Sequence, residues 1–422
     1  MGKKVSILSF LLAVIGVSLT LLIIAISGKP IGEYVILLYV VLYLFFQRKI
    51  YKPRDKIIAI YILIMILSTV SCICFDLGED WSRTSLRELI WVCIFYLFVS
   101  SVWCLSEKKK KLLIKAIKIG VSIHLIWCIF QLIAIQFGLD LNDVVFNNML
   151  HLGVDKTWSS QGVYMVTGFW SHHQCLDVLL IFSFLLFQNP FIKLLTIIIC
   201  VGTKSSTCIL GMATCIVLYL IFKYKDVIKN FYTRFSKKKF LSGTLFVVLV
   251  ILFVLFSKDI IGSIQIQLER LISRLSGGTR DYSTLTHIYY YETYIDVLKK
   301  SSFSQIVFGY GNSCSGYPFV GGFSEAGSLL QNWKVESDII NIFVSNGILG
   351  GTVFYLWMFS RAIKGIKINY RYFIFFVVIF IEGFAYQLQT HWVLIIEMIM
   401  SAFILSGEDF FSYPYLERTM NK

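Results

Sequence analysis

Long apolar runs separated by short polar segments repeat along almost the whole chain. An α-helix needs about 20 apolar residues to cross a bilayer, so runs near that length predict membrane helices. We place them at 5–27, 31–47, 56–75, 89–105, 112–137, 174–188, 190–202, 207–222, 240–257, 339–360, 371–389 and 391–407. Because the runs at 174–188 and 190–202 are short, we expect about 12 spans, or about 11 if one of them is re-entrant.

The composition supports this reading of the pattern. Of the 422 residues, 57% are hydrophobic and only 15% are charged, which excludes an ordinary soluble enzyme domain. We see no segment of different composition that could fold as a separate soluble domain. The sequence therefore predicts one all-α integral membrane domain over residues 1–422.

The net charge of +14 would suggest nucleic-acid binding in a soluble protein. Here the basic residues gather in the runs RKIYKPRDK, EKKKKLLIKAIK, KYKDVIKNFYTRFSKKK and RAIKGIKINYR. These runs all fall in cytoplasmic segments if both termini are cytoplasmic, which satisfies the positive-inside rule. We therefore expect contact with membrane lipids and none with nucleic acid. The first span lacks a small-residue cleavage site, so we expect it to be a retained anchor.

Two outward segments stand out between the spans. Residues 138–173 are rich in glycine, tryptophan and polar residues, and residues 258–337 form a long polar loop. Within that loop, helical spacing of apolar residues over 260–275 predicts an amphipathic helix on the membrane surface. The stretch RDYSTLTHIYYYETYIDVLKK predicts a second helix, with His287 and Tyr291 on one of its faces.

Two carboxylates, Glu336 and Asp338, stand where the long loop meets the next span. Polar groups at a membrane boundary are costly, so they suggest a functional site. For Asp338 an equally good explanation is helix capping. Glu336 has less structural reason to be there, and a partly desolvated carboxylate suits a general base. Asn341 and Ser345 continue a polar face into the span, and Gly347, Gly350 and Gly351 permit close helix approach.

Three arginines of the long loop, Arg270, Arg274 and Arg280, could bind a lipid-linked pyrophosphate, because a guanidinium binds phosphate oxygens with two donors. A solvated face or contact with lipid headgroups is the alternative explanation. Arg280 has the better claim because it stands at a helix start after SGGT. The weaker candidates for phosphate binding are Arg83, Arg87 and Lys204, and snorkelling explains Lys204 equally well.

Polar residues also stand inside or at the ends of the predicted spans. His172 and His173 open the sixth span, and His173 shares a face with Asp177 four residues later. A polar pair bonded within the bundle is one explanation, and metal binding would need more ligands than we find. Glu382 and Glu397 lie within predicted spans and could belong to an ion path. The ten cysteines show no metal-type spacing.

Four stretches resemble Wzy-type polymerases of the O-antigen polymerase and ligase superfamily, which are bacterial surface-glycan enzymes. They are VTGFWSHHQCLDVLL, GTKSSTCILGMA, GGTRDYSTLTHIYYYETYIDVLKKSSFSQIVFGYG and VESDIINIFVSNGILGG. The resemblance covers roughly residues 160–360 and the overall pattern of spans. Lys204 stands where an arginine is common in the family. Glu336 stands near the position where the ligase branch has histidine, which favours a polymerase.

The resemblance implies a GT-C-like membrane glycosyltransferase that uses no cofactor, nucleotide sugar or required metal. It would move a glycan from undecaprenyl pyrophosphate onto another lipid-linked repeat unit, at the outer face of the bacterial cytoplasmic membrane. Its partners would be these lipid-linked oligosaccharides and a chain-length regulator protein. Arg280 would neutralise the leaving pyrophosphate, and Glu336 or Asp338 would deprotonate the acceptor. The further candidates for substrate binding are Arg270, Arg274, Arg83, Arg87, Lys204, His172, His173, His287, Tyr291 and Asn341.

Three other functions stay open at this point. A ligase of the same superfamily would pass the glycan to a lipid A core. A flippase or another transporter of lipid-linked oligosaccharides would need a cavity lined from both halves of the chain. A non-catalytic membrane scaffold would account for the spans but not for the polar groups at the start of the span after the long loop.

Overall fold

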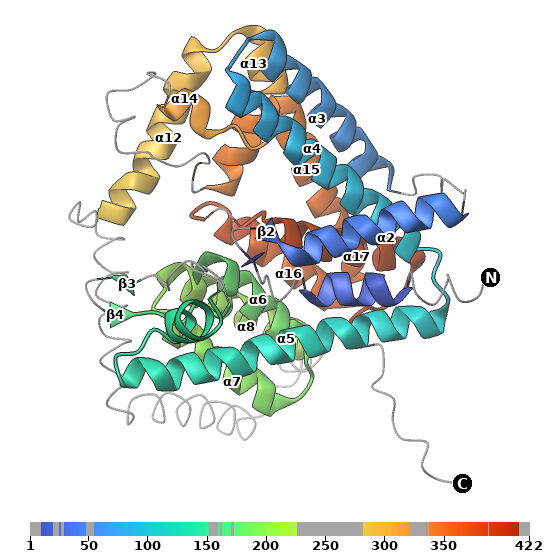
Figure 1. Ribbon diagram of the computed structural model, residues 1–422, viewed down its shortest axis with the longest axis vertical. Coiled ribbons are helices and arrows are strands. Elements are labelled where there is room, and N and C mark those ends of the chain that lie inside the picture. The colour runs from blue at the N-terminus through green and yellow to red at the C-terminus, as the bar shows by residue number, and fades with distance from the viewer. Residues whose placement is uncertain are drawn as a thin grey trace, which may run out of the picture.

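The computed structural model describes residues 10–19, 25–26, 29–47, 55–151, 159–160, 163–169, 173–225, 282–320, 335, 337–386 and 388–412. Almost all regular structure in this part of the chain is helical (Figure 1). The strands are two hairpins of two-residue strands: β1 (Ala25–Ile26) with β2 (Lys29–Pro30), and β3 (Ser159–Ser160) with β4 (Val163–Tyr164). The predicted all-α class is confirmed.

Five helices in the described residues are long and apolar enough to cross a membrane. They are α3 (Lys56–Cys74), α4 (Glu79–Val102), α5 (Glu107–Gln136), α8 (Ser206–Lys223) and α15 (Asp338–Ile366). The shorter apolar helices are Phe10–Leu19, α2 (Ile31–Gln47), α6 (His173–Leu186), α7 (Pro190–Gly202), α16 (Tyr370–Glu382) and α17 (His391–Ser406). The protein is thus an all-helical membrane protein, while the number of spans and a GT-C-like fold stay predictions.

Most predicted spans coincide with helices, and two helices begin earlier than predicted. The helix α4 begins at Glu79 and α5 at Glu107, so each includes a polar stretch before its apolar run. Acidic residues in the first turn favour these starts because they complement the helix dipole. The apolar pattern alone could not detect polar turns that continue a helix. The predicted helices at 240–257 and 260–275 lie outside the described residues.

The span predicted at 371–389 is shorter than expected. Its helix, α16, ends at Glu382, and Gly383 follows as the C-cap residue. Residues 383–386 and 388–390 are not helical, and the backbone of Gln389 donates instead to the carboxylate of Asp338, at 3.0–3.1 Å. A tertiary contact therefore replaces the last two helical turns that the apolar pattern predicted.

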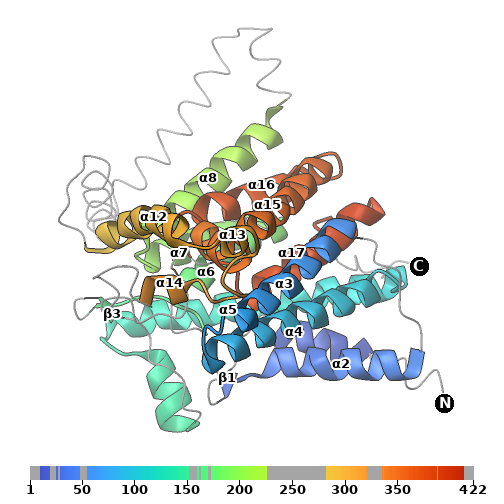
Figure 2. The same ribbon diagram turned by 90° about the horizontal axis from the view of Figure 1, so that it is seen from above.

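The helix α15 lies at the centre of the arrangement. It packs against α3 and α16, and α16 packs in turn against α8 and α6. Figure 2 shows α15 and α16 side by side with α8 next to them. A large buried apolar cluster draws residues from α2 to α8 and from α15 to α17. This cluster joins the first and last thirds of the chain into one body.

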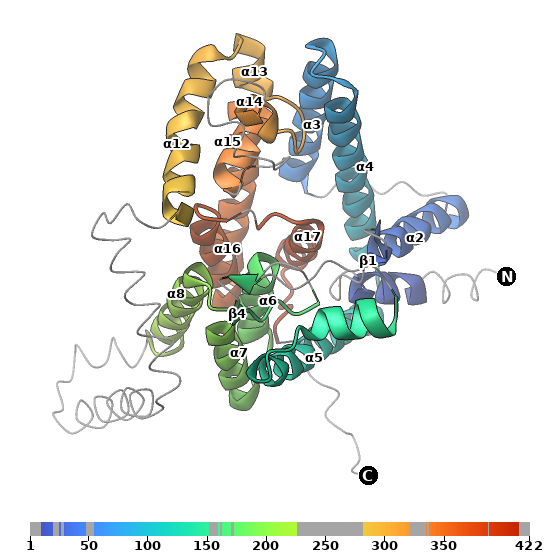
Figure 3. The ribbon, with the colours of Figure 1, turned by 60° about the vertical axis from the view of Figure 1, so that its left-hand side comes forward.

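The described part of the long loop is folded against the bundle. It contains α12 (Tyr282–Lys300), α13 (Phe303–Phe308) and α14 (Gly316–Val320), and α12 confirms the second loop helix predicted from the sequence. Figure 3 shows α12 running alongside α15, with α13 and α14 at its end. Tyr290 and Val297 of α12 are buried in a second, smaller apolar cluster, together with Tyr310 and Phe319.

A kink at Gly347 shapes the first part of α15. This residue has φ 68° and ψ −179°, which interrupts the helix. The carbonyls of Val344 and Ser345 accept the backbone N–H groups of Tyr310 and Gly311, each at 3.0 Å. A Cβ at position 347 would lie only 2.2 Å from the carbonyl oxygen of Val307. The predicted close helix approach is confirmed, and the partner of Gly347 is the end of α13, a short helix of the long loop.

Candidate functional site

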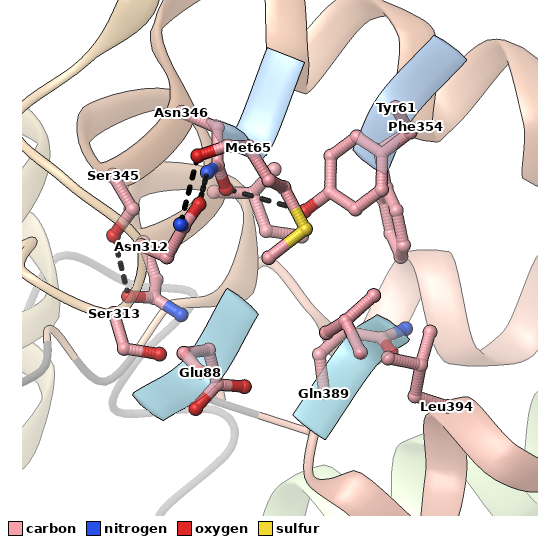
Figure 4. A pocket seen from close by; sticks show the side chains of 13 residues that line it. Tyr61, Met65, Glu88, Asn312, Ser313, Ser345, Asn346, Phe354, Gln389 and Leu394 are labelled. Atoms are coloured by element: carbon pink, nitrogen blue, oxygen red, sulfur yellow. Dashed lines mark hydrogen bonds between the residues drawn. The ribbon is translucent and has the colours of Figure 1, made fainter. Parts of the chain in front are cut away.

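A small polar cavity lies where α3, α4 and α15 meet the loop after α13 and the segment before α17 (Figure 4). Its volume is about 50 Å³, which is room for a few water molecules or one polar substituent of a larger ligand. The polar side chains that line it are Tyr61, Glu88, Asn312, Ser313, Asn341, Ser345, Asn346 and Gln389. Such a density of polar groups among apolar helices favours a functional site.

Asn312 organises one wall of the cavity. Its side-chain amide donates to Thr69 Oγ1 at 2.6 Å and to the carbonyl of Met65 at 3.0 Å, both on α3. Asn346 donates to Asn312 Oδ1, and Tyr61 Oη donates to Asn346 Oδ1 at 3.2 Å. Figure 4 shows the bonds that join Asn312, Asn346 and Tyr61. Buried polar groups satisfied in this way hold the loop in one position against the bundle.

The opposite wall carries an ionisable group. Glu88 of α4 faces the cavity, and its Oε1 lies 3.1 Å from Nε2 of His391. The other ring nitrogen, Nδ1, lies 2.8 Å from Oε1 of Glu33. An ionised carboxylate only accepts hydrogen bonds, so the imidazole satisfies both partners when both of its nitrogens carry a proton. The three side chains come from α4, α17 and α2.

The rings of Trp91 and Phe95 pack beside His391, with the Phe95 centroid 5.2 Å from that of the imidazole. The His391 side chain is 23% exposed and that of Glu88 16%. Partial burial strengthens the electrostatic contact between them, because the surrounding protein screens charge less than water does. The pair is therefore held firmly while one edge of Glu88 stays open to the cavity.

Asp338 lies close to the cavity but does not line it. It is only 2% exposed, and its carboxylate accepts the backbone N–H of Gln389. Ser337, not Asp338, is the N-cap residue of α15. The side chain of Gln389 lines the cavity and donates to Glu397 Oε1 at 3.1 Å. Asp338 thus ties the segment before α17 to the start of α15.

Asn341 confirms the polar face predicted for the start of α15. It lines the cavity, and its Oδ1 accepts hydrogen bonds from the hydroxyls of Ser315 and Ser345. Asn341 and Ser345 lie together because they are four residues apart on one helix, as predicted, whereas Ser315 comes from the loop. This face of the helix is therefore covered by the folded loop rather than by lipid.

The other predicted residues that the structure describes do not line the cavity. Arg83 is exposed and forms an ion pair with Glu79, and Arg87 is exposed on the same helix. Lys204 donates to the carbonyl of Tyr164 at 3.2 Å, and burial lowers the pKa of Lys204. Tyr291 Oη donates to the carbonyl of Phe384 at 2.7 Å. Burial raises the pKa of Tyr291, and that residue fastens α12 to the end of α16.

The remaining predicted residues cannot be placed relative to the cavity. Glu336, Arg270, Arg274, Arg280 and His172 lie outside the described residues. His173 opens α6 and His287 lies within α12, but their side chains are also outside the described part. That the loop arginines lie close to the carboxyl groups of Glu336 and Asp338 therefore stays a prediction.

A second polar contact region joins 163–169 to the turn between α7 and α8. Val166 donates its backbone N–H to the carbonyl of Gly202 at 3.2 Å. Ser205, which caps α8, donates its hydroxyl to Asp177 Oδ2 at 3.2 Å. Ser205 is thus one described partner of Asp177.

Sequence reasoning missed Glu33, Glu88, His391 and Asn312. A signal was available for three of them. Glu33 and His391 stand at the start of an apolar run, and Glu88 stands just before one. The positive-inside assignment puts all three at the same membrane face. Asn312 carried no such signal, because its importance comes from the way the loop folds back onto α3.

No protein-family model matches the chain, and no curated protein matches it. Among the described residues, no group of three or more His, Cys, Asp or Glu side chains is arranged to hold a metal ion. A functional assignment must therefore come from the residues of the cavity and from the motifs in the sequence.

Proposed function

We propose that the protein is a membrane glycosyltransferase that joins oligosaccharide repeat units carried on undecaprenyl pyrophosphate into a surface polysaccharide. In this proposal it is a Wzy-type polymerase acting at the outer face of the bacterial cytoplasmic membrane. The observation that carries the proposal is Glu88, an ionisable group held by His391 at the edge of a polar cavity. Under the positive-inside assignment, that cavity opens at the face where the lipid-linked donor is presented.

The chemistry that we propose requires a base and an anion site. The acceptor hydroxyl attacks the anomeric carbon of the donor sugar, so a new C–O bond forms as the bond to the pyrophosphate oxygen breaks. The hydroxyl proton passes to Glu88, and the electron pair of the broken bond leaves with the undecaprenyl pyrophosphate. Ser313 and Asn341 offer hydrogen bonds to the acceptor. General-base catalysis of this kind contributes about 10² to 10⁴ in rate.

Glu88 suits the role of base better than Asp338 does. The Asp338 carboxylate is 2% exposed and holds the backbone of Gln389, whereas Glu88 lines the cavity. His391 would orient Glu88, as the third member of a catalytic group commonly does. The candidates for binding the pyrophosphate stay Arg280, Arg274 and Arg270 of the long loop. Electrostatic stabilisation of a leaving anion commonly makes a large contribution to lowering the activation barrier.

Contacts between the stretches that carry the family resemblance also support the proposal. The Gly-x-Gly turn at 309–311 lies against the carbonyls of Val344 and Ser345. The stretch that begins at Val166 lies against the turn after Gly202. If the chain shares the architecture of this family, we expect the stretches that resemble the family to pack against each other in pairs.

The test uses the full chain in proteoliposomes supplied with an undecaprenyl-pyrophosphate-linked oligosaccharide. Chains of increasing length that stay on undecaprenyl are expected for the polymerase, and a strict need for a lipid A core acceptor would instead identify a ligase. Glu88→Gln is expected to slow extension by about 10² to 10⁴. Glu79→Gln is the matched control, because Glu79 lies on the same helix with a side chain that is 76% exposed. If Glu88→Gln extends chains at the normal rate, Glu88 is not the base.

A transporter of lipid-linked oligosaccharides is the second candidate, and one observation favours it. Glu382 is 2% exposed, and neither of its carboxyl oxygens has a hydrogen-bond partner among the described residues. Buried carboxyl groups within membrane helices commonly mark ion paths. A fluorescent lipid-linked oligosaccharide, quenched from outside the vesicles, measures transport. Transport that Glu382→Gln abolishes and Glu88→Gln spares would favour this candidate over the polymerase.

A further inference from the structure

Two lysines from two helices lie over the ring of Tyr219, and an arginine from a third helix lies nearby. Lys193 of α7 places Nζ 3.7 Å from the ring centroid, and Lys223 of α8 places Nζ 5.6 Å from it. Arg371, in the first turn of α16, follows Tyr370, whose ring centroid lies 5.8 Å from that of Tyr219. Basic residues of three helices thus lie in one neighbourhood.

Two of the three cations are buried. Lys193 and Arg371 are each 8% exposed. The ammonium of Lys193 also lies 4.6 Å from the ring centroid of Phe184, and Arg371 Nη1 donates to the carbonyl of Leu185 at 3.2 Å. Arg371 Nε has no hydrogen-bond partner among the described residues. Lys223 is exposed, so the group has an open side.

No carboxylate in the described part of the chain forms an ion pair with Lys193, Lys223 or Arg371. A ring face attracts a cation but does not neutralise it. Like charges repel strongly where protein and lipid replace water, because the dielectric there is low. An anion from outside the chain would offset this repulsion. Guanidinium and ammonium groups both bind phosphate, the guanidinium with two donors and the ammonium as a point charge.

The position of the group identifies the source of the phosphate. Arg371 follows the end of α15 that is opposite to Asn341, so most of the length of α15 separates the two. The group is therefore remote from the polar cavity. The positive-inside assignment puts these helix ends at the cytoplasmic leaflet, where anionic phospholipids attract basic side chains.

We propose that Lys193, Lys223 and Arg371 bind the headgroup phosphate of an anionic phospholipid in the cytoplasmic leaflet. The two buried cations contact the phosphate from the protein side, and Lys223 closes the site from the open side. Bound there, the lipid joins α7, α8 and α16, so its role is distinct from the glycan chemistry of the polar cavity.

Native mass spectrometry of the full chain tests the proposal by titrating phosphatidylglycerol or phosphatidylcholine into the detergent-solubilised protein. The wild type is expected to bind phosphatidylglycerol preferentially, and Arg371→Gln is expected to weaken that binding about tenfold. The matched control is Lys364→Gln, which removes the same charge from an exposed position in the last turn of α15. Equal affinity of wild type and Arg371→Gln for phosphatidylglycerol would overturn the proposal.

A second variant keeps the test decisive if Arg371→Gln does not fold. Lys223 is exposed, so Lys223→Gln is expected to fold normally and still to weaken phosphatidylglycerol binding relative to Lys364→Gln. Inorganic phosphate forms a separate arm of the titration. If it displaces the lipid completely at equal concentration, the site binds soluble phosphate and the lipid assignment is wrong. Retention of phosphatidylglycerol against excess phosphate supports the assignment.

Discussion

His391 Nε2 lies 3.1 Å from Glu88 Oε1, although the two residues belong to helices far apart in the sequence. The same imidazole reaches Glu33 through Nδ1 at 2.8 Å. One histidine therefore joins α17, α4 and α2 at the edge of the polar cavity. Each carboxylate gains a charge-assisted hydrogen bond when the ring carries both protons, and such bonds are about twice as strong as neutral ones.

The first prediction concerns the role of His391 under the proposed function. His391→Gln should lower kcat for chain extension by about 10- to 100-fold with a smaller change in KM, because Glu88 loses its orientation but not its carboxylate. Glu33→Gln should have a smaller effect, since it contacts only the far nitrogen. Rates of chain extension in proteoliposomes measure both variants. His151→Gln, at an exposed position, is the control. If kcat for His391→Gln equals that of the control, His391 does not position the base.

The second prediction concerns the kink in α15. Gly347→Ala should destabilise the protein by roughly 3 kcal/mol or more, because it combines a positive φ with a clash against the loop backbone. Gly138 has the same φ of 68°, and a Cβ there would meet nothing within 4 Å. Gly138→Ala should therefore cost only about 1–2 kcal/mol. Thermal unfolding in detergent measures the stability of both variants. Equal losses of stability would show that the loop backbone does not contact Gly347 closely.

The third prediction concerns a buried ion pair at the start of α3. Asp55 accepts hydrogen bonds from Arg361 at 2.7 and 3.2 Å and from Trp357 at 2.8 Å. Asp55→Asn should cost about 3–5 kcal/mol, because it leaves the buried guanidinium of Arg361 without its counter-charge. Replacing both residues, as Asp55→Leu with Arg361→Met, should cost less. Chemical unfolding measures the two variants, and a larger loss in the double variant would contradict this explanation.

The same pair predicts how stability depends on pH. Burial tends to raise the pKa of Asp55, but the hydrogen bonds and charge of Arg361 outweigh burial and lower that pKa below its usual value. The stabilisation is therefore fully present above the unfolded-state pKa of about 3.9, and it is lost as the pH falls through the lower, folded-state value. Unfolding measured between pH 7 and pH 3 should show a steeper acid loss in the wild type than in Asp55→Leu/Arg361→Met.

The fourth prediction concerns the docking of the long loop. Asn312→Ala should destabilise the loop by about 1–3 kcal/mol, because it removes two donors to α3 and leaves the amide of Asn346 without its acceptor. Limited proteolysis should then cleave the segment after α12 faster than in the wild type. Glu292→Gln, at an exposed position of α12, is the control for the loop. Unchanged proteolysis of Asn312→Ala would show that other contacts hold the loop in place.

Local pattern was sufficient to predict most of the helices. The predicted limits of α2 and α7 agree with the structure, and α12 was recognised inside a polar loop, since apolar spacing and helix-forming residues are properties of neighbouring positions. The polar starts of α4 and α5 were missed for the same reason, because their turns carry no apolar periodicity. The end of α16 was missed because the bond from Gln389 to Asp338 is a tertiary contact.

The amino-acid sequence by itself determined that this protein is a set of apolar helices with a polar face at the start of α15. Only the tertiary structure decided that Glu33, Glu88 and His391 meet, and that the loop at Asn312 closes the cavity over Asn341. The physical reason is the length scale of each interaction. A helix forms through bonds between residues four apart, whereas a buried ionisable group must find its partner wherever the packed helices bring one within reach.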